Sequence, residues 1–268
     1  MILSKTQFGF RKGCGTREAI GVMRVLCERS LEYGNDVFVC FVDFEKAFDR
    51  IDWITMMNIL KRIGIDWRDR RLILNLYMNQ RAVIKIQQEY SEEGEIGRGV
   101  RQGCSISPLL FNIYAEAMME EAMEDLEEGI KVGGNLLQDV RFADDQGMVA
   151  GSEIGLQKIM DRLNDTALRY GMKINIKKTK VMRVSNNKGE VNITINGTKL
   201  EQVRSFKYLG HTITDDGKCE TEICSRIAQA KAAFGSRKEL LTKSLKKDTK
   251  IKIVKTLVWT TLLYGCET

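Results

Sequence analysis

Two adjacent aspartates, Asp144 and Asp145, lie in the segment Arg141–Gln146 (RFADDQ) between two short apolar stretches. This pattern predicts a strand, a tight turn and a second strand, with both acids at the tip. Neighbouring carboxylates repel each other unless a cation neutralises them. A third acid, Asp43, ends the apolar run Val37–Val42 (VFVCFV), which is typical of a buried strand. Three carboxylates at strand ends suit a two-metal phosphoryl-transfer site. Polymerases are among the enzymes that use such a site.

Magnesium suits such a site because it takes oxygen ligands and also holds substrate phosphates. One ion would activate a primer hydroxyl, and the other would stabilise the leaving pyrophosphate. Asp43 is far from Asp144 in the sequence, so only the fold can bring the two together. An Asp-Asp pair is also common in ordinary turns, and this alternative stays open. Asp49 and Asp52 are interpreted as acids at a helix start.

The segment Gly99–Phe111 (GVRQGCSISPLLF) places a glycine-rich turn before Pro108, the single proline of the chain. Proline suits the first helical turn, and the start of a helix offers backbone N–H groups to an anion. Gln102 and Gly103 can lie flat against a base pair. The same segment also fits an ordinary loop before a helix.

A basic stretch, Gly171–Met182 (GMKINIKKTKVM), follows a predicted helix. A lysine beside a phosphate stays charged and can act as a general acid for a leaving group. Surface lysines without a catalytic role would give the same pattern.

The composition is that of a globular protein with material for a sizeable core. The chain has 268 residues, of which 43% are hydrophobic and 29% charged, and this length permits one large domain or two modest ones. No apolar stretch approaches the roughly 18–20 residues of a membrane span. The first residues lack the apolar run and cleavage site of a signal peptide. The composition therefore predicts no membrane partner and no secretion.

Charge is unevenly distributed along the chain, whose formal net charge is +6. All charged residues of the stretch Glu116–Glu128 are acidic, whereas those of Lys173–Lys207 and Arg226–Lys255 are mostly basic. The C-terminal third is thus the side expected to meet phosphates. A solvated helix face would produce the same runs of charge.

The cysteines argue against a zinc site. There are seven, no CxxC motif occurs, and His211 is the one histidine. Without a secretory signal, we interpret them as reduced thiols of an intracellular protein, in the cytoplasm or the nucleus.

Helices are expected where apolar residues recur at helical spacing between capping and breaking residues. The predicted helices are Thr16–Tyr33 with Thr16 as N-cap, Trp53–Ile63, Trp67–Met78, Ser107–Met123, Ser152–Tyr170 and a tail from Glu220 through Leu263. The predicted strands are Val37–Phe44, Ala82–Gln87, the two strands of the Asp-Asp hairpin, Met172–Ile176, Val181–Val184, Val191–Ile195, Lys199–Val203 and Phe206–Thr214. No regular βαβ repeat appears, so the order predicts an α+β fold.

Six segments together resemble the reverse transcriptases of non-LTR (LINE-type) retrotransposons, in order and in spacing. They are QFGFRKG (Gln7–Gly13), FVDFEKAFDRID (Phe41–Asp52), GVRQGCSISPLLFNIY (Gly99–Tyr114), RFADD (Arg141–Asp145), GMKINIKKTKVM (Gly171–Met182) and FKYLGHTIT (Phe206–Thr214). The tail, from Arg226–Phe234 through Thr261–Thr268, resembles the beginning of that family's thumb.

The resemblance implies a right-hand polymerase with an antiparallel palm sheet, partial fingers and the start of a helical thumb. Fingers and palm would interleave over residues 1–214, and the thumb would begin over residues 215–268. The implied activity is DNA synthesis on an RNA template from a DNA primer and dNTPs, with two Mg²⁺ ions, Mn²⁺ being the alternative. The hybrid would be held mainly through its backbone. The oligomeric state is left open.

The resemblance also assigns roles to single residues. Asp43 and Asp144 would be the principal metal ligands, and Asp145 the second acid of the pair. Lys178 would be the general acid. The remaining roles are Phe48 as the gate against a ribose 2′-hydroxyl, Gln102 and Gly103 at the dNTP and template pair, Arg11 at the template, and Leu209 and Gly210 as the primer grip.

The chain also departs from the family pattern. It starts at the QFGF segment, whereas relatives carry an upstream fingers segment with a basic triphosphate contact, and no endonuclease region precedes it. We therefore expect a truncated element or an incomplete gene model, ending within the thumb. An inactive remnant that binds nucleic acid through its basic tail is the main alternative. A palm of another polymerase or cyclase type is a further one, against which the segment Gly99–Phe111 argues.

Overall fold

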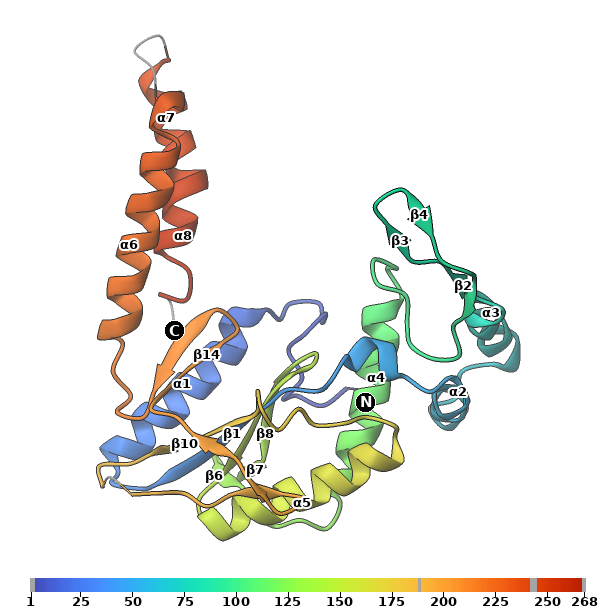
Figure 1. Ribbon diagram of the computed structural model, residues 1–268. Coiled ribbons are helices and arrows are strands. Elements are labelled where there is room, and N and C mark those ends of the chain that lie inside the picture. Colours follow the sequence, from blue (N-terminus) through green and yellow to red (C-terminus); the bar gives the residue numbers. More distant parts are fainter. Residues whose placement is uncertain (1–2, 188, 242–244, 267–268) are drawn as a thin grey trace.

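A five-stranded sheet lies at the centre of the computed structural model, which describes residues 3–187, 189–241 and 245–266 (Figure 1). Its strand order is β13-β10-β1-β9-β8, and every pairing is antiparallel except that of β10 with β13. The strands are β1 (Val37–Val42), β8 (Asp139–Phe142), β9 (Asp145–Ala150), β10 (Lys180–Val184) and β13 (Glu201–Gln202). The predicted α+β class is therefore confirmed.

Helices cover both faces of this sheet. The alternating residues Val37, Val39 and Phe41 of β1 pack with α1 (Thr16–Glu32), while the other three face α4 (Ser107–Met123) and α5 (Glu153–Arg169). All six residues of β1 are buried. Burial on both faces explains why this strand is an unbroken apolar run rather than an alternating one.

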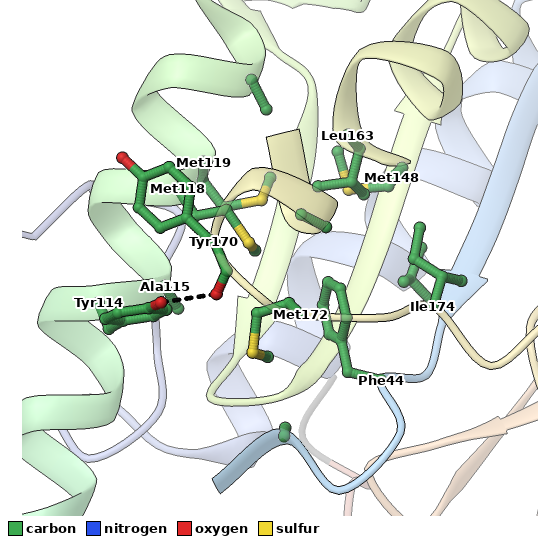
Figure 2. Packing of buried hydrophobic residues seen from close by; sticks show 14 of the residues in the cluster. Phe44, Tyr114, Ala115, Met118, Met119, Met148, Leu163, Tyr170, Met172 and Ile174 are labelled. Atoms are coloured by element: carbon green, nitrogen blue, oxygen red, sulfur yellow. Dashed lines mark hydrogen bonds between the residues drawn. The ribbon is translucent and has the colours of Figure 1, made fainter. Parts of the chain in front are cut away.

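The core between the sheet and α4 is rich in methionine and tyrosine. Figure 2 shows Tyr114 of α4 donating a hydrogen bond of 2.6 Å to the carbonyl oxygen of Tyr170, which follows α5. The two rings meet edge to face at 5.5 Å. Met118 and Met119 fill the space nearby, so α4 and α5 are joined by both packing and a buried hydrogen bond.

Smaller elements extend the molecule on the side of α4. They are η1 (Ala47–Arg50), α2 (Trp53–Arg62), α3 (Trp67–Tyr77) and the strand pairs β2 (Arg81–Ala82) with β5 (Gly94–Glu95) and β3 (Lys85–Ile86) with β4 (Glu89–Tyr90). A further pair, β6 (Ile130–Val132) with β7 (Asn135–Leu137), directly precedes β8 in the chain. The β3–β4 hairpin projects beyond α3 (Figure 1).

The C-terminal part consists of short hairpins followed by helices. The strands are β11 (Thr194–Ile195), β12 (Thr198–Lys199), β14 (Ser205–Tyr208) and β15 (His211–Thr214). The helices are α6 (Glu220–Ser236), η2 (Lys238–Leu240), α7 (Lys247–Val254), a π-helical turn η3 (Lys255–Trp259) and α8 (Thr260–Leu262). They rise as a column on the opposite side of the sheet from β3–β4 (Figure 1).

Several predicted elements need correction. Phe206–Thr214 is a hairpin rather than one strand, because Leu209 (φ 49°) and Gly210 (φ 79°) turn the chain back between β14 and β15. Ala82–Gln87 is divided between the strands β2 and β3. Met172–Ile176 makes only an isolated bridge, between Ile174 and Phe44.

The helix ends also differ in places from the predictions. Gly15, not Thr16, is the N-cap of α1, and its N–H is bound by the carboxylate of Glu18 at 2.8 Å. Ser152 caps α5 as predicted, through a 3.0 Å bond from the N–H of Gly155. The predicted tail helix is broken after α6, and its residues 242–244, like the terminal residues 267–268, lie outside the described residues.

No helix in the part of the chain that the structure describes is long and apolar enough to cross a membrane. The boundary predicted after residue 214 falls between β15 and α6 and stays a prediction.

The substitution Tyr114→Phe should lower the free energy of unfolding by about 1 kcal/mol, because it removes the buried hydrogen bond to the carbonyl of Tyr170. Urea unfolding followed by circular dichroism measures the change. Tyr33→Phe, at a side chain that is 72% exposed, is the matched control and should have almost no effect. Equal stability of the two variants would show that the hydrogen bond contributes nothing.

Candidate active site

The acids Asp144 and Asp145 lie at the tip of the β8–β9 hairpin, as the sequence predicted. Phe142 pairs with Asp145, so Ala143 and Asp144 form the two-residue turn. Ala143 has a φ of 57°, in the left-handed region that residues with a Cβ rarely adopt. The turn thus holds the Asp144 side chain at the exposed end of the hairpin, with Asp145 at the start of β9.

Asp43 reaches the same end of the sheet through the pairing of β1 with β9. Val42, the last residue of β1, is opposite Gln146 of β9. Asp43, which follows β1, is therefore next to Asp145, the first residue of β9. The backbone of Asp43 is fixed on its other side as well. Its N–H donates to Thr179 Oγ1 at 3.2 Å, and its carbonyl accepts from the N–H of Asn175 at 2.8 Å.

Burial and the charges of neighbouring carboxylates raise the pKa values of both hairpin acids. Partial burial raises the pKa of Asp144, and the charge of Asp43 raises it further. Burial raises the pKa of Asp145 to about 6, with the charges of Asp144 and Asp43 adding to the effect. Both hairpin side chains remain in contact with solvent, so the hairpin and its neighbours remove only part of their hydration. The site therefore disfavours full ionisation unless a cation is present.

A divalent cation fits this site in charge, because the acids lie at adjacent strand ends and the charge of Asp43 acts on both acids of the hairpin. The side chains do not yet converge. Among residues 3–187, 189–241 and 245–266, no three histidine, cysteine or acidic side chains are close enough together to hold one ion. Coordination by all three acids would thus require side-chain rotation.

Lys178, predicted from the resemblance as the general acid, lies beside Asp43. Its Nζ is 3.9 Å from Asp43 Oδ2, and its side chain is 70% exposed. The loop that carries it is held by a bond from the N–H of Lys178 to the carbonyl of Asn175. The structure therefore brings this lysine to the acids, with its amine free to move in solvent.

A cavity of about 570 Å³ opens next to Asp43 and contains an excess of basic groups. Its lining residues are Asp43, Phe44, Glu45, Lys46, Asp49, Arg50, Arg98, Asn175 and Lys178. Arg50 and Lys178 face carboxylates of Glu45 and Asp43. Lys46 and Arg98 have no acidic partner within 4.0 Å in the described part of the chain, so both are available to an anion.

The position of Arg98 is set by the residues that follow it. Gly99 donates to the carbonyl of Ile51 at 2.8 Å, and Val100 donates to the carbonyl of Phe48 at 2.9 Å. A Cβ on Gly99 would lie 2.9 Å from the backbone of Asp49, so only glycine allows this approach. The loop before α4 is thereby joined to the turn after Asp43.

Phe48, Gln102 and Gly103 lie on this same pair of segments. The Phe48 ring stacks on Phe111 of α4 at 4.3 Å. Gln102 is exposed, and Gly103 has a φ of 82° that favours glycine. The structure thus places the predicted nucleotide contacts on a loop fixed against the Asp43 segment.

The other predicted contacts, Arg11 and the pair Leu209 and Gly210, are held by hydrogen bonds to other parts of the chain. Arg11 donates from Nη1 to the carbonyl of Ser4 at 2.8 Å, which folds it back onto its own segment. Leu209 and Gly210 form the β14–β15 turn, which is held from the C-terminal helices: Tyr264 donates to the carbonyl of Leu209 at 2.6 Å, and Arg226 donates to that of Gly210. Tyr208 fastens the same hairpin to β8 through a 2.9 Å bond to the carbonyl of Val140.

The sequence predictions missed Lys46 and Arg98 as cavity residues. The sequence did contain partial evidence for both residues. Lys46 lies between Asp43 and Phe48, and Arg98 directly precedes the glycine-rich segment that starts at Gly99. Asp49 and Asp52 were interpreted as helix-start acids, and both lie at helix starts. Asp49 is in the first turn of η1 and also lines the cavity, and Asp52 caps α2 by accepting from the N–H of Thr55 at 2.7 Å.

Comparisons with known proteins agree on the family. Residues 1–213 match the family model described as reverse transcriptase (RNA-dependent DNA polymerase). The Pol polyprotein of the retrotransposable element R2 from Nasonia vitripennis is 23% identical over 83% of this chain and 22% of its own length. The RNA-directed DNA polymerase of the mobile element jockey from Drosophila funebris is 24% identical over 99% of this chain and 29% of its own length. The chain thus spans less than a third of either relative.

Solved structures support the fold. Telomerase from Candida tropicalis, solved with a fragment of telomeric RNA, superposes with a TM-score of 0.55 over 94% of this chain and 42% of its own. The apo form of the same enzyme, truncated of its C-terminal domain, gives a TM-score of 0.53 over 75% of this chain and 38% of its own. At 13% and 15% identity these likenesses concern the fold alone, which is that of a right-hand polymerase.

Asp145→Asn should stabilise the metal-free protein above pH 6. The raised pKa of Asp145 gives the wild type a stabilising contribution that is full below pH 3.8 and is lost as the pH rises through about 6. With EDTA at pH 8, the variant should therefore melt about 2–4 °C higher than the wild type, a gain limited by solvent screening, and the gain should shrink towards pH 4.

Thermal melts at pH 4, 6 and 8 measure this effect, with the exposed Asp165→Asn of α5 as the control. Addition of Mg²⁺ should then raise the melting temperature of the wild type more than that of Asp145→Asn. A constant difference across this pH range would contradict the proposed charge coupling.

Proposed function

The chain belongs to the reverse transcriptase (RNA-dependent DNA polymerase) family, of the kind carried by non-LTR retrotransposons, and on that premise we propose that it extends a DNA primer on an RNA template. The substrates would be dNTPs, and the reaction would be nucleotidyl transfer to the primer 3′-hydroxyl. One observation carries the proposal: the pairing of β1 with β9 brings Asp43 to the Asp144–Asp145 turn.

Asp43 and Asp144 are proposed to hold two Mg²⁺ ions, or Mn²⁺, with Asp145 as the second acid of the hairpin. When bound, such ions activate the 3′-hydroxyl and neutralise charge on the leaving pyrophosphate. The raised pKa values of Asp144 and Asp145 support the proposal, because a bound cation would offset both the burial of their charges and the repulsion from neighbouring carboxylates.

The cavity beside Asp43 is proposed to receive the dNTP. Arg98 and Lys46 would bind its triphosphate, since both line the cavity and neither is neutralised by a described carboxylate. Lys178 would donate a proton to the departing pyrophosphate, supported by its place 3.9 Å from Asp43. Phe48, held by its stacking on Phe111, would exclude a ribose 2′-hydroxyl.

The nucleic acid is proposed to be held by surrounding loops and helices. Gln102 and Gly103 would contact the template pair, Arg11 the template strand, and Leu209–Gly210 the primer. The division into fingers and palm (1–214) and the start of a thumb (215–268) follows the same proposal. A chain with these partners would act inside the cell, where its seven free cysteines would stay reduced.

Asp144→Asn should abolish primer extension and leave binding of the RNA–DNA hybrid nearly intact. The substitution removes a charged metal ligand, which should cost orders of magnitude in rate, whereas the hybrid is bound through backbone phosphates elsewhere. Extension of a labelled primer on an RNA template, with dNTPs and Mg²⁺, measures the rate, and fluorescence anisotropy measures the binding.

The outcomes separate the two functions considered for this chain. Extension by the wild type alone supports the polymerase and its acids. Extension by Asp144→Asn as well would refute the assignment of this site. Salt-sensitive hybrid binding by both proteins, without extension by either, would instead support a catalytically inactive protein that binds nucleic acid.

Arg98→Ala should raise the KM for dNTP about tenfold with a smaller change in kcat, because it removes one charge-assisted contact to the triphosphate. Steady-state extension at varied dNTP concentration measures both constants. Arg71→Ala, at an exposed arginine of α3, is the matched control and should leave the KM unchanged. An unaltered KM in Arg98→Ala would exclude Arg98 from the triphosphate site.

A further inference from the structure

The N-terminal segment adds an extra edge to the palm sheet beside β8. Phe8 donates to the carbonyl of Arg141 at 2.8 Å, and Arg141 donates to the carbonyl of Thr6 at 2.9 Å. The bridge between Gln7 and Arg141 is parallel. This short pairing carries the chain along the hairpin towards the Ala143–Asp144 turn.

Gln7 is fully buried at this edge, with no exposed surface. Its side-chain oxygen, Oε1, accepts two backbone hydrogen bonds, from Gly9 at 2.8 Å and from Ala143 at 3.1 Å. One amide side chain therefore joins the N-terminal segment to the residue directly before Asp144, although the two are 136 positions apart.

Ala143 needs such support because its backbone lies in the left-handed region, with a φ of 57°. Its side chain is also almost completely buried, so solvent does not readily replace the bond from Gln7. This strained conformation sets the direction in which the chain leaves β8 and hence the position of Asp144. The hydrogen bond from Ala143 to Gln7 opposes relaxation of the turn.

Gly9 and Asn112 hold the other side of this arrangement. A Cβ on Gly9 would lie 2.5 Å from the nitrogen of Ala143. The N-terminal segment therefore packs against the turn at a distance that leaves no room for a side chain at Gly9. Asn112 of α4, also fully buried, donates from Nδ2 to the carbonyl of Gly9 at 2.7 Å. The turn is thus connected through Gly9 to the central helix of the core.

We propose that Gln7 is a positioning residue: through its bonds to Gly9 and Ala143 it fixes the turn that presents Asp144 to the reaction. This proposal rests on the polymerase function proposed above. Gln7 does not touch a substrate. It acts through Ala143, and Gly9 and Asn112 give it a rigid support.

Primer-extension kinetics of Gln7→Met test this role, because methionine has a similar length and cannot accept the two bonds. We expect kcat to fall at least about tenfold, since a small displacement of a catalytic group is costly, while the dNTP KM and the hybrid Kd stay within about threefold. The matched control is Thr6→Val in the same segment, which removes side-chain bonds to Ser4 and Arg141 and keeps those of Gln7. It should keep kcat within about twofold.

Two kinetic results would overturn the proposal. An unchanged kcat in Gln7→Met would show that the turn keeps its conformation without the bond. An equal fall of kcat in Thr6→Val would show that docking of the whole segment matters, and not the acceptor of Gln7.

Amide hydrogen exchange at Ala143 gives a readout that does not depend on activity, and its measurement in the wild type does not depend on the folding of a variant. In the wild type this N–H should exchange slowly, as a buried and bonded group, and in Gln7→Met it should exchange faster. Rapid exchange in the wild type would by itself refute the proposed hydrogen bond from Ala143 to Gln7. A wild type that fails to extend primers would count against the proposed function, and the exchange result would still decide the role of Gln7.

Discussion

Repulsion among the carboxylates of Asp43, Asp144 and Asp145 is the constraint that the rest of this structure must satisfy. Like charges at neighbouring strand ends favour separation, and this repulsion adds to partial burial in raising the pKa values of the two hairpin acids. The antiparallel pairing of β1 with β9 opposes it, because β1 is buried on both faces and each large apolar side chain contributes about 1.5–3 kcal/mol. The packed sheet therefore holds together charges that would otherwise move apart, and a cation would remove the remaining repulsion.

The elements nearest the acids could be predicted from local sequence. Val37–Val42 is an apolar run that suits a doubly buried strand, and Arg141–Gln146 combines strand residues with acids that favour a turn, so β1 and the β8–β9 hairpin formed where expected. Ser107 and Pro108 likewise marked the start of α4 correctly. These patterns act within a few residues of the chain, which is why the sequence alone reveals them.

The remaining features depend on contacts between distant segments, or on backbone conformations that residue types do not disclose. Leu209 adopts a left-handed conformation, so the chain reverses within what looks like one strand. Arg98 reaches the cavity only because Gly99 packs against the backbone of Asp49. Gln7 gains its partner Ala143 through a parallel pairing that its own neighbours do not indicate. Such long-range contacts connect the hairpin, the loop before α4 and the N-terminal segment into one support for the acids.

The central claim is that these three acids form one divalent-metal site, and anomalous diffraction from crystals containing Mn²⁺, an RNA–DNA hybrid and a dNTP tests it most directly. The account predicts manganese peaks held by Asp43 and Asp144, next to the cavity that contains Lys46 and Arg98. Well-ordered crystals with substrate bound and no manganese at these acids, or with manganese only at the buried Glu116 of α4 and Asp139 of β8, would contradict it.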